Sequence, residues 1–247
     1  MKVTLTRITE DPIMAIEEAA SNCYDSNPSK EGKIMKHCIS SGHTSVTEFC
    51  TFTFHIEGVS RALLAQITRH RHMSFAVRSQ RYCNEDGFGY VTPPLIQNDY
   101  KAFKLYKDFM DACQSTYKKL QELGIRNEDA RFVLPNACET VLEVSMNLRE
   151  LMLFMNERLC MCAQWEIRHL AQLMKREVLK EVPQLDSYLV PKCEKYGKDF
   201  AFCTESSKRS CHMNPLKSEW MRAYDELKNA EEEISNYKYE KLMDKGE

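Results

Sequence analysis

Cationic and hydroxyl side chains are concentrated between residues 69 and 82. These residues include four arginines, two histidines and two serines, and no Asp or Glu occurs from Gly58 to Asn84. Arginine presents a rigid fork of donors that suits phosphate and carboxylate groups, and serine hydroxyls add further donors. The alternative is a solvated charged surface, but such surfaces usually mix Lys with Glu. The stretch therefore predicts a site for an anionic ligand.

Two groups of donors can be separated within this stretch. In Arg69-His70-Arg71, an extended backbone would point the two guanidinium groups to one side and the imidazole to the other. In Arg78-Ser79-Gln80-Arg81, two guanidinium groups three residues apart could hold a phosphate together with the hydroxyl. No glycine-rich phosphate loop accompanies them, and nothing in the sequence marks the neighbouring Cys83 as an activated nucleophile. A nucleotide would be held by side chains.

Composition limits the class of protein. The 247 residues are 43% hydrophobic and 28% charged, which is ordinary for one globular domain with or without an appendage. The net charge of −2 creates no general attraction for nucleic acid. Residues 1–7 lack the apolar core of a signal peptide, and no apolar run is long enough to span a membrane. Eleven cysteines without a compact disulfide framework favour a reducing, cytoplasmic location.

Periodicity predicts three strands and several helices. The strands are expected at Lys2–Ile8, Cys50–Ile56 and Thr140–Met146, with Phe52, Phe54 and Ile56 on one face. The main helices are expected at Pro12–Ala20, Lys30–Ser40, from the cap Ser60 to Arg69, Asp99–Glu122, Asn127–Leu134, Asn147–Arg158 and Gln164–Val182. The helix from Asp99 to Glu122 is expected to turn these apolar side chains toward the core: Phe103, Tyr106, Phe109, Met110, Cys113, Tyr117 and Leu120.

The composition changes after Pro191. Cys193, Cys203, Cys211 and His212 could supply four zinc ligands, but their spacings are long, and the adjacent Cys211-His212 pair suits one tetrahedral ion poorly. A packed loop that carries thiols is the favoured interpretation, and no metal site is assigned. A highly charged helix is expected from Pro215 to about Lys241.

Several motifs together resemble the flavin-dependent thymidylate synthases. Arg69-His70-Arg71 followed by Ser79 is similar to the family's Arg-His-Arg signature with its later serine. Further similar segments occur in the family's order, over about residues 1–190: Gly42-His43 with Glu48, Phe52–His55, Glu128–Pro135, Asn147–Arg149, Asn156–Arg158 and Ala163–Ile167. Ala76-Val77 departs from the pattern, because polar or acidic residues are common there in the family.

The resemblance implies a fold and an activity. The expected fold is α+β, an antiparallel sheet flanked by helices in a single domain (1–190), with an added C-terminal tail (191–247) that contains the cysteine loop and charged helix. The implied reaction is the reductive methylation of dUMP to dTMP. Its one-carbon donor is 5,10-methylenetetrahydrofolate, and NADPH is the reductant through FAD. The family implies a homotetramer with active sites shared between subunits, and neither a membrane nor a nucleic acid as partner.

Residue roles also follow from the resemblance. Arg158 is implied as the catalytic residue on the uracil edge, where a positive charge would favour loss of the N3 proton. The implied dUMP-binding residues are Gln66, Arg69, Ser79, Gln80, Arg81 and Arg131. The implied FAD-binding residues are Arg69, His70, Arg71, Asn147 and Arg149.

Plainer interpretations stay open for single residues. Arg149 and Arg158 could be charges on a helix surface, and Arg131 could pair with Asn127 or Glu128 on its own helix. For the whole chain, the alternative is a non-catalytic nucleotide- or nucleic-acid-binding protein that uses the Arg/His-rich stretch.

Overall fold

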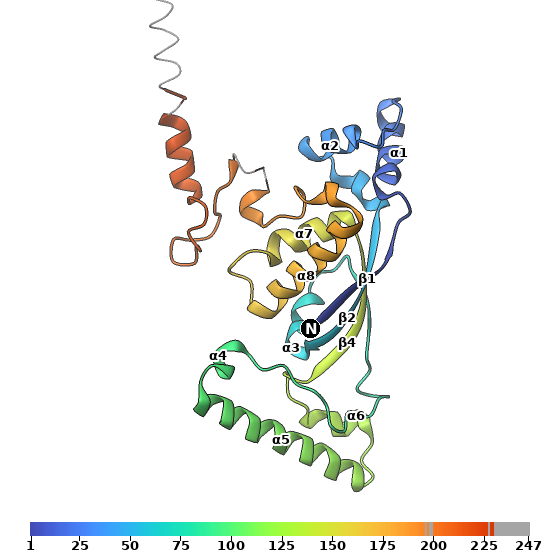
Figure 1. The fold of residues 1–247 in the computed structure, drawn as a ribbon, viewed down its shortest axis with the longest axis vertical. Coiled ribbons are helices and arrows are strands. Elements are labelled where there is room, and N and C mark those ends of the chain that lie inside the picture. Colours follow the sequence, from blue (N-terminus) through green and yellow to red (C-terminus); the bar gives the residue numbers. More distant parts are fainter. Residues whose placement is uncertain (196, 198–199, 227, 230–247) are drawn as a thin grey trace, which may run out of the picture.

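A computed structural model describes residues 1–195, 197, 200–226 and 228–229. Its centre is an antiparallel sheet in the order β1-β2-β4-β3 (Figure 1). The strands are β1 (Lys2–Ile8), β2 (Thr51–Ser60), β3 (Ser74–Val77) and β4 (Glu139–Asn147). The α-helices are α1 (Pro12–Tyr24), α2 (Lys33–Ser40), α3 (Arg61–Ile67), α4 (Pro94–Gln97), α5 (Tyr100–Glu122), α6 (Asn127–Ala130), α7 (Leu148–Arg158) and α8 (Trp165–Glu181). Short 3-10 helices occur at Thr44–Phe49, Arg131–Val133, Pro183–Leu185 and Lys192–Glu194.

One face of the sheet forms the main core. Phe52, Phe54 and Ile56 of β2 are fully buried, as their alternation predicts. Helices α3, α7 and α8 lie on this side of the sheet (Figure 1). The opposite face of the sheet is polar, and there the His55 ring contacts Glu143 across the strands at 2.7 Å. The prediction of an α+β fold with an antiparallel sheet flanked by helices is confirmed.

Strand β2 is longer than predicted because a glycine inside it forms a bulge. The prediction stopped at Ile56, before Glu57-Gly58. In the structure, the pairing with β4 shifts between Glu57 and Val59, and Gly58 has a φ of +67°. Glycine tolerates this left-handed conformation, so one residue bulges and the strand continues to Ser60.

Several other boundaries differ from the prediction. Helix α1 continues to Tyr24, and α2 begins only at Lys33, after Gly32 has adopted a left-handed conformation with a φ of +68°. The sequence patterns missed β3 and α4, which have four residues each. Segments this short carry too few residues to show a period.

Helix α5 packs on a second, smaller core. It lies across one end of the molecule (Figure 1), where Cys113 packs with Phe88 and Cys138. Of the apolar side chains predicted to face a core, Phe109 is 58% exposed, so that prediction is wrong for this residue. The reason is that the loop beside α5 covers only one side of the helix.

The tail contains its own local packing. Cys203 forms a parallel bridge with Leu216, and the Trp220 ring contacts Phe202 at 5.5 Å between ring centroids. Helical structure begins at residue 217, close to the predicted start at Pro215, and the part of the predicted helix from 230 to Lys241 lies outside the described residues. No helix in the described part of the chain is long and apolar enough to cross a membrane.

Candidate active site

The Arg69-His70-Arg71 segment forms a turn at the end of α3. The backbone N–H groups of Arg69 and His70 donate to the carbonyls of Gln66 and Ile67 at 3.3 and 3.0 Å. The condition of an extended backbone is therefore not met, because the turn of the helix continues past Ile67. The two arginine side chains are exposed, whereas the His70 side chain is only 9% exposed and points inward.

A chain of hydrogen bonds runs from Asn147 to Arg158 through His70. The Asn147 side chain caps α7 by accepting from the Glu150 backbone N–H at 3.0 Å. The Glu150 carboxylate lies 3.2 Å from His70 Nδ1, and Arg158 Nε lies 3.1 Å from His70 Nε2. An arginine can only donate, so His70 Nε2 accepts and Nδ1 carries the proton toward Glu150. The ring is held neutral in one tautomer.

Burial and charge act together on this chain. Burial and, to a smaller extent, the positive charge of Arg158 together lower the pKa of His70 to about 4. Burial raises the pKa of the Glu150 carboxyl. His70 therefore serves as a neutral acceptor for Arg158 near neutral pH.

Arg158 is held on one side only. Its Nε is bound to His70, while its two terminal nitrogens make no hydrogen bond to a described residue. Burial lowers the pKa of Arg158, the negative charge of Glu157 raises it in part, and the nearby positive charge of Arg69 lowers it again. Two close guanidinium groups, with no acid of the described residues bonded to either side chain, form a site that favours an anion.

A cavity of about 430 Å³ lies beside this chain. Asn147, Arg149 and Glu150 line it from the start of α7, together with His72 from the Arg/His stretch. Arg149 is exposed and forms an ion pair with Glu48, which also lines the cavity. The cavity size is in the range of small-molecule sites, and its lining combines hydrogen-bond donors with the apolar Leu153.

The second group of predicted residues lies near α6. Arg81 Nε donates to the Glu128 carboxylate at 2.8 Å, and Arg131 Nε donates to the Glu128 backbone carbonyl at 3.1 Å. Ser79 Oγ accepts from the Arg81 backbone N–H at 3.3 Å, and the Gln80 amide lies 3.6 Å from Cys138 Sγ. Both arginine side chains are exposed. This part of the stretch is thus brought together with Arg131, as the resemblance implies.

Arg78 does not join this group. Its guanidinium donates to the Glu85 carboxylate at 3.0 Å and to the Asn84 carbonyl at 3.1 Å. The predicted phosphate cluster of Arg78 with Arg81 is therefore wrong. The chain turns between the two arginines, where the Cys83 backbone N–H donates to the Ser79 carbonyl at 2.9 Å, and each side chain binds a different acid.

The two groups lie toward opposite ends of β4. The Arg78 backbone N–H pairs with Val141 near the start of β4, whereas Asn147 ends the strand and leads into α7. A strand of nine residues extends about 26 Å. Gln66 and Arg69 belong to the α7 end, with Arg158, whereas Ser79, Gln80, Arg81 and Arg131 belong to the α6 end. The candidate residues of one chain therefore form two separate groups, named the α7 half-site and the α6 half-site.

Sequence reasoning missed the acids that organise both half-sites. Glu150 binds His70 and Glu128 binds Arg81, although neither lies near its partner in the sequence. Glu150 had one available signal, because it stands three residues after Asn147, as an acid does in a helix capping box.

Comparison with known proteins identifies the family. A family model described as thymidylate synthase complementing protein matches residues 4–184. A flavin-dependent thymidylate synthase from Nitratidesulfovibrio vulgaris is 37% identical over 239 residues, which cover 87% of this chain and 96% of the relative. The chain belongs to the flavin-dependent thymidylate synthases.

Other members of the flavin-dependent thymidylate synthases agree with this assignment. One from Geobacter sulfurreducens is 41% identical over 205 residues, which cover 78% of this chain and 88% of the relative. A crystal structure of thymidylate synthase X from Helicobacter pylori, with FAD and dUMP, matches with a TM-score of 0.64. Its sequence identity is 24%, and the match covers 76% of this chain and 99% of that one. This structural likeness shows a shared fold.

Proposed function

We propose that this chain catalyses the reductive methylation of dUMP to dTMP. 5,10-Methylenetetrahydrofolate is the one-carbon donor, and NADPH is the reductant through FAD. Family membership supports the reaction. The observation that carries it is the arrangement of Arg158, which is bound to a neutral His70 by one nitrogen and whose terminal nitrogens make no hydrogen bond to a described residue.

The residues around the larger cavity fit a flavin dinucleotide. Asn147 and Arg149 line the cavity, and Arg69 and Arg71, just before the lining residue His72 in the chain, supply further exposed guanidinium groups for a pyrophosphate. Both His70 nitrogens already bind Glu150 and Arg158 of the same chain. His70 would therefore contact a cofactor through its ring carbons. FAD, when bound, supplies the carrier chemistry for the hydride and the one-carbon unit.

Arg158 would act on the uracil ring. Its positive charge favours loss of the N3 proton of dUMP, and the resulting anion has more electron density at C5. Arg158 cannot serve as the base because a guanidinium stays protonated. Gln66 and Arg69 would hold the nucleotide from the same half-site, whereas Ser79, Gln80, Arg81 and Arg131 would bind its phosphate from the other.

The separation of the half-sites supports a shared site. Because the ends of β4 lie about 26 Å apart, one bound dUMP would reach both groups most simply between subunits. A homotetramer satisfies this requirement through closed symmetry.

Residues 1–190 would form the catalytic domain, and residues 191–247 would form its tail. All eleven cysteines are free thiols in the structure, which suits the reducing cytoplasm.

The reaction is tested by release of tritium from dUMP labelled at C5. The purified chain is expected to be yellow from bound flavin. It should release tritium only when methylenetetrahydrofolate, NADPH and FAD are all present. Colourless protein that takes up no FAD, or flavin-containing protein that releases no tritium, would contradict the proposal. Nucleotide binding without either activity would favour the non-catalytic alternative.

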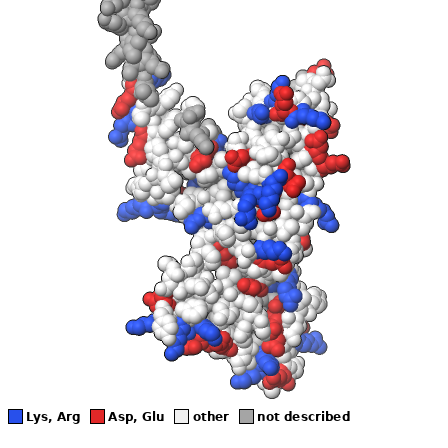
Figure 2. Space-filling model, viewed as in Figure 1, with Lys and Arg blue, Asp and Glu red and all other residues white. Residues whose placement is uncertain are grey.

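Figure 2 shows basic and acidic side chains interspersed on one face of the molecule, which gives no support there to nucleic-acid binding.

A further inference from the structure

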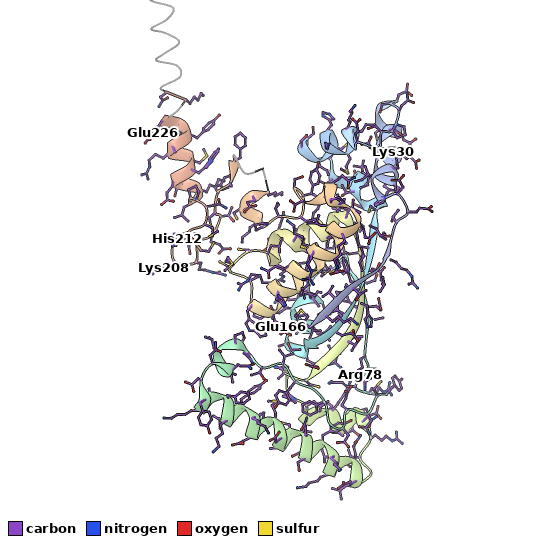
Figure 3. The ribbon with its side chains drawn as sticks, in the orientation of Figure 1. Lys30, Arg78, Glu166, Lys208, His212 and Glu226 are labelled. Carbon is purple, nitrogen blue, oxygen red and sulfur yellow. The ribbon has the colours of Figure 1, made fainter. Side chains whose placement is uncertain are left out.

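Five cysteines line one small cavity between the body and the tail. The cavity has a volume of about 140 Å³ and lies between the connection of α7 to α8 and the segment after Pro191. The cysteines that line it are Cys160, Cys162, Cys193, Cys203 and Cys211. In Figure 3, the loop that carries Lys208 and His212 lies beside this connection. None of the five belongs to the half-sites described above.

The spacing of the sulfur atoms suits a metal ion. The sulfurs of Cys160 and Cys162 and a carboxylate oxygen of Glu205 all lie within 4.8 Å of one another. A tetrahedral zinc site with Zn–S distances of about 2.3 Å places its sulfurs about 3.8 Å apart. Cys193 lines the same cavity from the segment after Pro191. Thiols from the body and from the tail thus border one small space.

Two cations and two carboxylates surround the cysteines, since Lys192 and Glu194 line the cavity and Arg209 lies beside Glu205. Glu205 is ion-paired with Lys192, and Arg209 Nε lies 3.6 Å from its carboxylate. The Arg209 backbone carbonyl also accepts a hydrogen bond from the Cys162 thiol at 2.9 Å. Because two cations already hold Glu205, this carboxylate is better placed as a neighbour of the ion than as its ligand. The cations would offset the negative charge of coordinated thiolates.

The chemistry of the donors selects the metal. Thiolates are soft ligands, and a closed set of four thiolates is the ordinary environment of structural Zn²⁺. A bound Zn²⁺ displaces the thiol protons to solvent as each Zn–S bond forms, with no change in oxidation state.

We propose that this cavity is a structural zinc site held by Cys160, Cys162 and Cys193. One further tail thiol, Cys203 or Cys211, completes the tetrahedron. This ligand set differs from the four residues considered in the sequence, because Cys160 and Cys162 enter from the body and His212 does not line the cavity. The proposal is independent of the proposed function.

The site would fix the tail to the catalytic body. Cys193 begins a segment that reaches Lys195, and Lys195 lines the larger cavity beside Asn147 and Arg149. A zinc ion that joins Cys193 to the end of α7 would hold this wall in place.

Metal content tests the site directly. The full chain, purified under reducing conditions and dialysed against buffer with added zinc and then without it, is expected to retain about one zinc per chain. Replacement of zinc by Co²⁺ should give thiolate-to-cobalt charge-transfer absorption and the strong d–d bands of a tetrahedral ion. Less than about one tenth of a zinc per chain in the wild type, or the weak bands of octahedral cobalt, would overturn the proposal.

Matched variants locate the ligands. The double variant Cys160→Ser/Cys162→Ser and the single variant Cys193→Ser are expected to lose at least about tenfold in retained zinc. Cys23→Ser, which changes an exposed cysteine on α1, should retain as much as the wild type. Circular dichroism shows whether each variant is folded. If folded Cys160→Ser/Cys162→Ser retains wild-type zinc, or if Cys160 and Cys162 of the zinc-loaded wild type react with a thiol-alkylating reagent as fast as Cys23, the ligand set is wrong.

Discussion

Arg158 combines a fixed position with free donor groups. His70 binds one nitrogen of the guanidinium, Glu150 orients the His70 ring, and Asn147 fixes the start of the helix that carries both Glu150 and Arg158. Such a preorganised charge stabilises a developing anion without rearrangement. At the scale of single residues, this arrangement is what distinguishes Arg158 from an ordinary charge on a helix surface.

Replacement of Arg158 should separate methyl transfer from flavin reduction. Arg158→Ala is expected to lower kcat for dTMP formation by about 10²- to 10³-fold, because one preorganised charge is lost. NADPH oxidation by the flavin should stay measurable. Arg176→Ala removes an exposed arginine from α8 and should leave both rates unchanged. Near-normal dTMP formation by Arg158→Ala would refute the assigned role.

His70 should make stability depend on pH below neutrality. Its pKa of about 4 in the folded chain lies below the ordinary value of about 6.5, so the unfolded chain binds more protons between these values. Its contribution is therefore complete above about pH 6.5 and is lost as the pH falls toward 4. Between about pH 7.5 and pH 5, the free energy of unfolding should fall by about 2 kcal/mol from this residue alone.

Urea titrations of the wild type and His70→Gln at both pH values measure this contribution. The variant keeps a donor and an acceptor but cannot titrate, so its loss of stability should be smaller by the stated amount. Equal losses in the two proteins would show that His70 does not remain neutral in the folded chain.

The candidate site could be predicted in part from single residues. The types of Arg69 and Arg81 indicated an anionic ligand, and the family resemblance added Arg131 and Arg158. The structure leaves Arg69, Arg81 and Arg131 exposed and the terminal nitrogens of Arg158 without a partner among the described residues. The absence of acids along the stretch was misleading, since Glu85, Glu128 and Glu150 reach it from elsewhere. A stretch without acids in the sequence can still be surrounded by acids in the fold, because other parts of the chain bring them to it.

At the scale of elements, a buried carboxylate anchors the helix that precedes the Arg/His stretch. Glu166 of α8 accepts the Ser60 backbone N–H at 2.7 Å and the Ser60 hydroxyl at 2.6 Å. The same hydroxyl accepts from the Leu63 backbone N–H and so caps α3. Figure 3 shows Glu166 at the base of α8, beside α3. The direction in which α3 delivers Arg69 therefore depends on α8.

Removal of this anchor should be costly. Glu166→Ala leaves two buried donors of Ser60 without their acceptor, which is expected to reduce the free energy of unfolding by about 3 kcal/mol. Glu181→Ala, at the exposed end of the same helix, should change it by less than about 0.5 kcal/mol. Guanidinium denaturation measures both values. A similar small effect for the two variants would show that Ser60 finds other partners.

The sequence predicted best those elements in which the periodic pattern of buried residues repeats over a long segment. Strand β2 and helix α8 were predicted because their buried residues recur over many positions. Strand β3 has only four residues and exists because β4 offers it an edge, so its cause lies in tertiary pairing. The continuation of β2 through Gly58 likewise depends on its pairing with β4.

At the scale of the whole molecule, the proposed active site needs residues from more than one chain. The α7 half-site contains Arg158, and the α6 half-site contains Arg81 and Arg131, toward opposite ends of β4. Exposed apolar side chains such as Leu105 and Phe109 of α5 are available for contacts between subunits. Mixed oligomers can test this arrangement, because each half-site can be damaged separately.

The decisive measurement is complementation between two inactive variants. Arg158→Ala damages one half-site and Arg131→Ala damages the other, so each variant alone should form little dTMP. When equal amounts are dissociated and reassembled together, a site built from two chains is intact in about one quarter of random pairings. The mixture should therefore recover about one quarter of wild-type dTMP formation. A mixture that is shown to exchange subunits but stays as inactive as its components would contradict the shared site.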